Sequence, residues 1–258
     1  MPEATTAFNK LSTAITIGTF AGFFILWELV SKSGMFNANL FPPPSVILGA
    51  FLESFADGEF KRDVSASIFR VGMGFMLGSI LGISLGLMTG RVYLFRVTIG
   101  QLLNFLRNIP SIAFVPLAIV WLGISEASKI FLVVWGVIFP VWINTHQGAA
   151  QINEQYLWAI RSLGANRMQA IKEVVLPSTL PFVVVGLRMG IALAFITLVA
   201  AEIAGAFYGI GYRISSSHLI FRVDKMLLGI VTLGLLGFFA DKLYVFAIKK
   251  TLPWIEIR

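Results

Sequence analysis

Six long runs of mainly apolar residues dominate the chain, and short polar segments separate them. A helix needs about 20 mostly apolar residues to cross a bilayer, and each run is close to that length. The predicted spans are residues 14–31, 66–89, 99–122, 128–147, 180–206 and 226–248. The pattern therefore predicts an all-α polytopic membrane protein with six transmembrane helices, in which residues 1–258 form a single membrane domain.

The segment between the fourth and fifth predicted spans, at about residues 151–179, is polar enough to lie outside the membrane. Its pattern predicts two short amphipathic helices that meet at Gly164, because glycine readily adopts the left-handed conformation that ends a helix. Asn166 begins the second helix, and Gln169 three residues later completes a capping box. We expect Pro177 to end this helix, since proline cannot continue the hydrogen-bond ladder.

The second of these short helices is expected to bury one face and expose the other. The predicted apolar face consists of Met168, Ile171, Val174 and Val175, and the predicted wet face of Arg167, Lys172 and Glu173. A solvated helix pair between membrane spans indicates a docking site for a partner outside the membrane.

The second predicted span carries a glycine at every fourth position. These are Gly74, Gly78, Gly82, Gly86 and Gly90. At 3.6 residues per turn they lie along one helix face, where a neighbouring backbone can approach closely. We therefore assign the five glycines to helix packing.

The same span contains Gly82-Ile83-Ser84-Leu85-Gly86, which matches the Gly-x-Ser-x-Gly motif of serine hydrolases. His146 is a conceivable partner for Ser84, so an intramembrane serine protease is one alternative function. Against it, the motif works on a strained strand-to-helix turn, whereas Ser84 falls in a continuous apolar helix.

Proline and polar residues interrupt the third predicted span. Pro110 and Pro116 each remove a backbone donor, which is tolerated in a membrane where the helix lines a cavity or is covered by protein. A charge in that setting is costly and marks a functional candidate. The candidate translocation pathway consists of Arg107, Asn108, Asn144 and Glu202. The alternatives are that Arg107 reaches the interface or pairs with an acid, and that Glu202 is a structural anchor.

Composition narrows the function further. The chain is 57% hydrophobic and 13% charged, with a mean hydropathy of +0.84, which excludes an ordinary soluble domain. Its net charge of +7 comes from scattered basic residues, so it indicates anionic headgroups or an anionic solute rather than nucleic acid. With two histidines and no cysteine, we expect no metal site.

The polar loop resembles the signature loop of the membrane subunits of ABC importers. That pattern is Glu-Ala-Ala, three residues, Gly, nine residues, Ile-x-Leu-Pro; here Gly164 and Val174-Val175-Leu176-Pro177 match it, while Trp158-Ala159-Ile160 replaces the first triplet. Other segments resemble the importer permeases for nitrate, taurine and aliphatic sulfonates, closest to the sulfonate and taurine branch. They include Phe41-Pro-Pro-Pro-Ser45, Ser67-Ile-Phe-Arg-Val-Gly72, Arg107-Asn-Ile-Pro110, Ile143-Asn-Thr145, Ala201-Glu202 and Gly209-Ile-Gly-Tyr212.

This resemblance implies the type I ABC importer permease fold, in a bacterial inner membrane, with cytoplasmic N- and C-termini. It implies a pore-forming subunit that moves a small organic or inorganic anion by alternating access. The implied partners are two ABC ATPase subunits, a second copy of the permease and an external solute-binding protein. The implied ATPase-coupling residues are Trp158, Ala159, Ile160, Leu163, Gly164, Ala165, Asn166, Leu176 and Pro177.

The resemblance also implies that this chain is not itself an enzyme, and that ATP and Mg²⁺ bind to the partner ATPase. The sequence agrees, since it contains no Gly-x-x-x-x-Gly-Lys-Ser/Thr phosphate loop. A secondary carrier driven by an ion gradient is the main alternative. Such carriers usually have broken helices in both halves of an inverted repeat, whereas one interrupted span is evident here.

Overall fold

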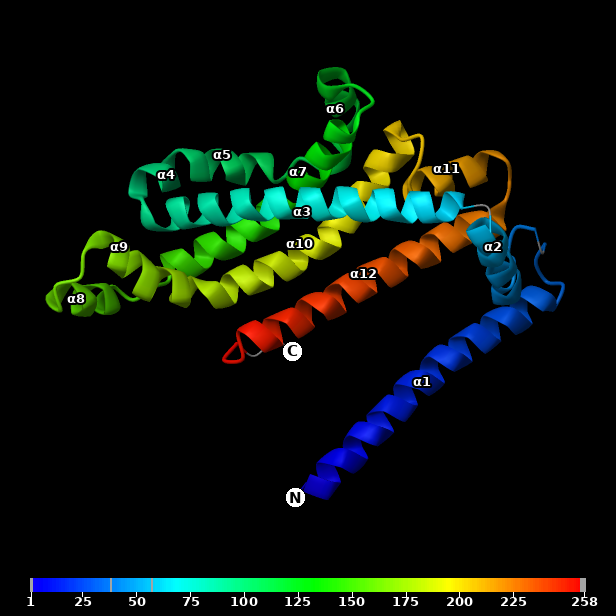
Figure 1. Ribbon diagram of the computed structural model, residues 1–258, viewed down its shortest axis with the longest axis horizontal. Coiled ribbons are helices and arrows are strands. Elements are labelled where there is room, and N and C mark those ends of the chain that lie inside the picture. The colour runs from blue at the N-terminus through cyan, green and yellow to red at the C-terminus, as the bar shows by residue number, and fades with distance from the viewer. Residues whose placement is uncertain (1, 38, 57, 256–258) are drawn as a thin grey trace. The chain divides into compact units, whose positions relative to one another are not determined.

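The computed structural model describes residues 2–37, 39–56 and 58–255, and within these residues every regular element is a helix (Figure 1). The first elements are α1 Pro2–Lys32, α2 Pro44–Ala56, α3 Glu59–Arg91, α4 Tyr93–Val97, α5 Ile99–Leu106, the 3₁₀ turn η1 Ser111–Phe114 and α6 Val115–Leu122. The remainder are α7 Glu126–Ala150, α8 Glu154–Ser162, α9 Arg167–Ala170, the π turn η2 Ile171–Val175, α10 Leu176–Gly205, α11 Ile210–Leu219 and α12 Val223–Thr251.

The chain divides into two compact units. One contains Met1–Lys61 and Arg213–Val231, and the other contains Arg62–Tyr212 and Thr232–Arg258. The second unit holds the helices that carry most of the candidate site.

Five described helices are long and apolar enough to cross a membrane. They are Ile15–Lys32, Glu59–Arg91, Glu126–Ala150, Arg167–Gly205 and Val223–Thr251. A sixth candidate span is the pair Tyr93–Leu106 and Ser111–Leu122, which is bent by 87°. The bend falls at Pro110, because a residue that precedes proline is pushed out of the helical region. The prediction of an interrupted third span is thereby confirmed.

The main core of the second unit lies where α3, α7 and α10 meet (Figure 1). It contains Val133, Val137 and Val141 of α7 and Ala194 and Leu198 of α10, and side chains of α3 pack against them. Helices α7 and α10 run antiparallel, since Gly186 lies against Asn144 and Gly190 against Val137.

The glycine row of α3 lies directly against α7. A β-carbon built on these glycines would come within 2.5–2.8 Å of a β-carbon of α7 at every step. The pairs are Gly74 with Val133, Gly78 with Val137, Gly82 with Val141, Gly86 with Thr145 and Gly90 with Ala149. The residue numbers of the paired positions rise together on α3 and α7, so the two helices run parallel with their backbones in close approach.

The expectation that Pro177 ends a helix is wrong. Helix α9, the π turn η2 and α10 continue without a break from Arg167 to Gly205. Pro177 lies in the first turn of α10, directly after the π turn. Proline lacks the N–H that would continue the hydrogen-bond ladder, and the ladder is already irregular at this point because the π turn directly precedes it.

Candidate functional site

The loop between α7 and α10 has the local structure that its sequence predicts. Gly164 has φ +84°, and the Gly164 and Ala165 N–H groups donate to the Arg161 and Ile160 carbonyls at 2.9 and 3.2 Å, which is a Schellman motif. The Gln169 N–H donates to the Asn166 side chain at 2.9 Å, and the Gln169 side chain accepts from the Asn166 N–H at 2.7 Å. The predicted capping box is confirmed.

One side of this loop is anchored to the membrane helices. Leu157 of α8, Ala170 of α9 and Val175 of η2 are buried in one cluster, against which Leu87 of α3 packs. The Arg91 guanidinium adds an ion pair to Glu154 at 3.3 Å. The loop is therefore packed against the C-terminal part of α3 (Figure 1).

The other side of the loop exposes large apolar side chains. Tyr156 is 62% exposed, Trp158 63%, Met168 58% and Leu163 87%; we call these four residues the coupling surface. The predicted apolar face of the second short helix is therefore half wrong. Met168 and Ile171 are exposed, whereas Val175 is buried and Val174 partly so, because the four residues are divided between α9 and the π turn and do not share one α-helical face.

Most residues assigned to coupling lie on the exposed side of the loop. Trp158, Ala159, Leu163, Gly164, Asn166, Leu176 and Pro177 are exposed, and Ile160 and Ala165 are half-buried.

A pocket of about 200 Å³ lies beside the break in the third span. Its lining includes Arg107 and Pro110 of the break, Trp135 and Phe139 of α7, and Thr197 of α10. No hydrogen bond or ion pair joins the exposed Arg107 side chain to any residue that the structure describes.

The other amide candidates lie away from this pocket. The Asn108 side chain donates to the Asn104 carbonyl at 2.7 Å. The Asn144 side chain donates to the Pro140 carbonyl at 2.8 Å and lies 3.7 Å from the Met189 sulfur, so it faces α10.

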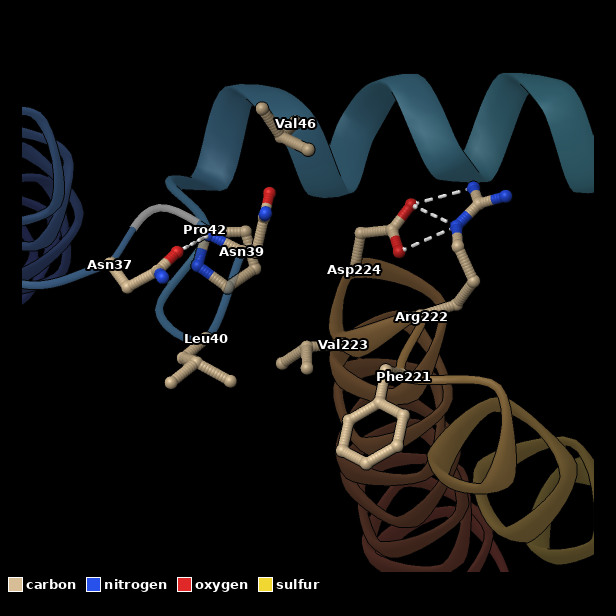
Figure 2. Close-up of a pocket in the computed structure, with 9 residues that line it drawn as sticks. All are labelled: Asn37, Asn39, Leu40, Pro42, Val46, Phe221, Arg222, Val223 and Asp224. Carbon is tan, nitrogen blue, oxygen red and sulfur yellow. Dashed lines mark hydrogen bonds and ion pairs between the residues drawn. The ribbon is translucent and has the colours of Figure 1, made fainter.

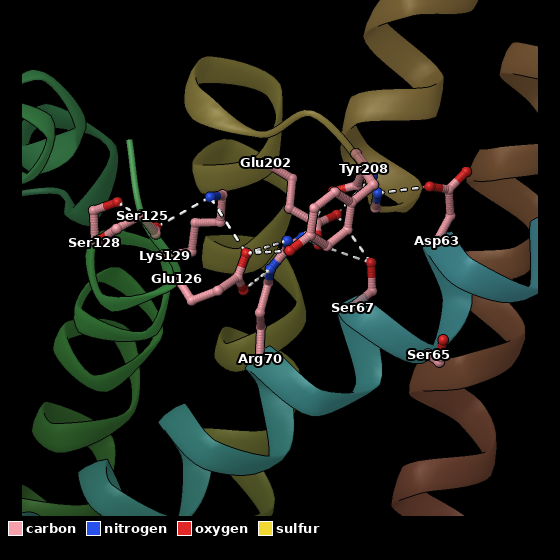
Figure 3. A network of polar contacts seen from close by, with 12 residues as sticks. Asp63, Ser65, Ser67, Arg70, Ser125, Glu126, Ser128, Lys129, Glu202 and Tyr208 are labelled. Atoms are coloured by element: carbon pink, nitrogen blue, oxygen red, sulfur yellow. Dashed lines mark hydrogen bonds and ion pairs between the residues drawn. The ribbon is translucent and has the colours of Figure 1, made fainter. Parts of the chain in front are cut away.

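Glu202 of α10 is fully buried in a polar network that joins α3, α7 and α10 (Figure 3). The Arg70 guanidinium, also fully buried, donates from Nη1 to Glu202 at 2.6 Å, and from Nε and Nη2 to Glu126 at 2.6 and 2.7 Å. The Ser67 hydroxyl lies 2.8 and 3.0 Å from the two Glu202 carboxylate oxygens. The structure favours the alternative that Glu202 is a structural anchor.

The network also fixes the turn between α10 and α11. The backbone N–H of Gly209 donates to Asp63 at 2.8 Å, and that of Gly211 donates to Glu202 at 2.8 Å. Gly209 has φ +127°, and a β-carbon there would lie 2.5 Å from the Glu202 carboxyl carbon. Sequence reasoning missed this network, although the charges of Arg70, Glu126 and Glu202 near the ends of three spans were its signal.

The geometry does not support the protease alternative. The Ser84 hydroxyl donates to the Ile80 carbonyl of its own helix at 2.7 Å. His146 Nδ1 lies 2.9 Å from the Thr89 hydroxyl, which also accepts from the Trp142 indole at 3.0 Å. Ser84 lies mid-helix rather than on a nucleophile elbow, and the contact that His146 makes is with Thr89.

The broken apolar span, the close-packed helix core and the anchored loop together define an all-α, multi-pass membrane protein. Residues 74–252 match the family described as the binding-protein-dependent transport system inner membrane component. The chain belongs to this family, and it is a permease subunit of an ABC transporter.

Three relatives are similar in sequence to this chain over most of its length. The taurine transport system permease protein TauC of Escherichia coli (strain K12) is 30% identical over 93% of this chain and 89% of its own length. SsuC of Bacillus subtilis (strain 168), named for aliphatic sulfonates transport, is 32% identical over 89% and 83%. The bicarbonate transport system permease protein CmpB of Synechococcus elongatus (strain ATCC 33912 / PCC 7942 / FACHB-805) is 31% identical over 86% and 83%.

The fold also matches a solved structure. A chain of the MetNI methionine ABC transporter, in an inward-facing conformation, superposes with a TM-score of 0.64 at 21% identity, over 78% of this chain and 98% of that one. The likeness confirms the predicted permease fold. With the family established, the secondary carrier and the protease are not favoured.

Proposed function

We propose that this permease forms the solute path of a bacterial importer for a small anion of the sulfonate or taurine type. The named relatives support this solute class, since their printed names refer to taurine, sulfonates and bicarbonate. The net charge of +7 and the Arg107 side chain, for which no partner is described, are consistent with an anionic solute. Uptake of radiolabelled taurine, an alkanesulfonate, nitrate and bicarbonate into vesicles tests this choice, and failure of all four would overturn it.

In this proposal two copies of the permease enclose the path, and two ATPase subunits bind ATP and Mg²⁺ on their own chains. An external binding protein delivers the solute. With six spans, the N- and C-termini fall on the same side as the loop between α7 and α10, which we place in the cytoplasm.

The coupling surface is the observation that carries the link to an ATPase. Four large apolar side chains stand exposed on a loop whose other side is packed onto α3. Exposed apolar patches of this kind mark interaction sites, and here Trp158 presents an aromatic surface where the family pattern has an acid. Closure of the ATPases on ATP would push this loop, and the packed cluster beneath it would transmit the push to α3.

Gly164→Val tests this link. Valine is β-branched and opposes the φ of +84° at Gly164, so the variant should deform the coupling surface. We expect the purified complex to lose most stimulation of ATPase activity by the solute-loaded binding protein. Gly123→Val is the matched control, since Gly123 has φ +71° with open space around it, as Gly164 does, but lies in the loop between α6 and α7.

Equal stimulation in both variants and the parent protein would contradict the assignment of the coupling surface. Equal loss in both would show that the effect is general strain rather than coupling.

The pocket at Pro110 is the proposed solute path, with Arg107 as its cation; Asn108 follows Arg107 in the chain but lies away from the pocket. A charged side chain at membrane depth is costly unless it faces water, a partner or an anion. Asn144 faces α10 and would enter the path only through a movement of that helix. Glu202 is left out, because its carboxylate is already paired with Arg70.

A further inference from the structure

The pocket at Pro110 lies wholly within the second unit, and its lining combines a polar part with an apolar part. Arg107 and Ser111 bring polar groups from the break in the third span. No hydrogen bond joins either side chain to any residue that the structure describes. Most of the remaining lining is apolar, and it consists of Ile109, Pro110, Trp135, Gly136, Phe139, Pro140, Leu193 and Ile196.

Other rings hold the aromatic part of this lining in place. The Trp135 ring centroid lies 4.2 Å from that of Phe114 and 5.2 Å from that of Phe139, which it meets edge to face. The Trp135 indole nitrogen is buried, so the indole offers the pocket its ring carbons rather than its donor. Because the ring contacts fix the indole before a solute arrives, this apolar surface is preformed, and ordering it costs little on binding.

Helix α10 adds apolar surface but no free hydroxyl proton. The Thr197 hydroxyl donates to the Leu193 carbonyl at 2.9 Å, so its proton is already engaged. Ile196 beside it is 64% exposed, and the fold therefore gains little from its burial. The donors that an anionic group needs lie at Arg107 and Ser111, whereas α10 contributes apolar contact.

A second pocket, of about 590 Å³, lies among residues of the first unit, and its charges are already paired (Figure 2). The Arg222 guanidinium lies 2.8 Å from Asp224 and 3.1 Å from Glu53. A small anion would have to displace an acid to bind there. None of the described residues that line the pocket at Pro110 is acidic, so Arg107 is available to a solute.

The volume of the pocket at Pro110 limits the solutes that it can hold. It is about 200 Å³, less than the roughly 300–1,000 Å³ of pockets for drug-sized ligands, so it suits an anionic head with a short carbon chain. Each methylene buried against an apolar surface strengthens binding about fourfold. An anion without a carbon chain, such as nitrate, would contact Arg107 but leave the apolar part of the lining empty.

We propose that the permease itself selects its solute by the carbon chain. Arg107 binds the anionic head, and Trp135, Phe139 and Ile196, which we call the chain wall, contact the carbon atoms. The inference rests on the proposed function, in which this pocket is the path of a small anion. It adds a selection step after the external binding protein, because a solute delivered without a matching chain gains only the contact with Arg107.

Alkanesulfonates with one to four carbons test the chain wall, because their head group is constant. Each is titrated by isothermal titration calorimetry against the permease–ATPase complex in nanodiscs, without the binding protein and with empty nanodiscs as the blank. In the parent complex the dissociation constant should fall about fourfold with each methylene. Arg107→Ala should abolish detectable binding of every member, since all of them share the sulfonate.

Ile196→Asn makes the chain wall polar with little loss of core packing, since this side chain is mostly exposed. The gain per methylene should fall to about twofold or less, while methanesulfonate should bind as it does to the parent complex. Ile203→Asn is the matched control, because Ile203 is 48% exposed about two turns further along α10 and does not line the pocket. Trp135→Ala should flatten the series as well, but it also disrupts the contact with Phe114, so the decision rests on Ile196→Asn.

Three results would overturn the chain wall: an unchanged gain per methylene in Ile196→Asn, an equal fall in Ile203→Asn, or sulfonate binding that survives Arg107→Ala. If the parent complex binds no alkanesulfonate although vesicles take alkanesulfonates up, the chain wall is overturned and the proposed function stands. Failure of uptake for every anion offered to the vesicles would overturn the proposed function itself.

Discussion

At the scale of single residues, Arg70 is unusual because its charged side chain is fully buried. Its side chain is fully buried between Glu126 and Glu202, which lie 56 and 132 positions away in the sequence. The sequence singled out Glu202 as an intramembrane acid but could not pair it. Nothing local to Glu202 identifies a partner, because the pairing depends on how α3, α7 and α10 pack.

Arg70→Met should therefore be severely destabilising. It leaves the Glu202 carboxylate buried without its cation, which typically costs about 3–5 kcal/mol. We expect a large fall in the melting temperature of the detergent-purified permease. Arg91→Met is the control, since the Arg91–Glu154 pair is substantially exposed and should contribute less than about 1 kcal/mol. Similar melting temperatures for the two variants would refute the anchoring role of the network.

At the scale of elements, the sequence predicted best what depends on neighbouring residues. The capping box of Asn166 and the left-handed Gly164 follow from side chains within five positions. The continuation of the helix through Pro177 could not be predicted in this way, because the π turn before it has no simple sequence signal. The burial of Met168 was also predicted wrongly, since periodicity assigns it to an apolar face without saying whether that face packs inside this chain.

The seam between α3 and α7 gives a sharp test at this scale. Gly82→Leu adds about four carbons where a single β-carbon would already lie 2.7 Å from Val141 Cβ and 2.9 Å from the Ile138 carbonyl. We expect the variant to fail to assemble, judged by size-exclusion chromatography and uptake. Gly72→Leu in the same helix has open space around it and should be neutral or slightly stabilising, since leucine favours helices over glycine.

If Gly82→Leu assembles and transports normally, the close seam is not required for the working protein. A matching failure of Gly72→Leu would show that bulk anywhere on α3 is harmful.

At the scale of the whole molecule, apolar run length predicted the spans well, because each crossing must satisfy its backbone within a helix. The 87° break in the third span followed from Pro110. The placement of Asn144 could not be predicted from the sequence, since its side chain is directed by the packing of α7 on α10. The two units likewise have no marker in the sequence.

Transport should depend on the charge at residue 107. Arg107→Ala removes a cation for which no partner is described, and the loss of one hydrogen bond to a charged group, about 1.5–3 kcal/mol, predicts roughly ten- to hundredfold slower uptake. Basal ATPase activity and binding-protein affinity should stay near the parent values. Arg107→Lys retains the charge and should keep most of the uptake. Unaffected uptake in Arg107→Ala would remove this residue from the path.

The parallel seam of α3 and α7 has a consequence for how the bundle assembles. Small or β-branched residues recur every four positions on both helices, so a slip of one turn, about 6 Å, would bring Gly78 opposite Val133 and Gly82 opposite Val137. Such a misaligned seam would pack almost as well as the native one. The Arg70–Glu126 pair at its end would break, so this ion pair, in which Arg70 is fully buried, selects between two registers that are similar in their apolar packing.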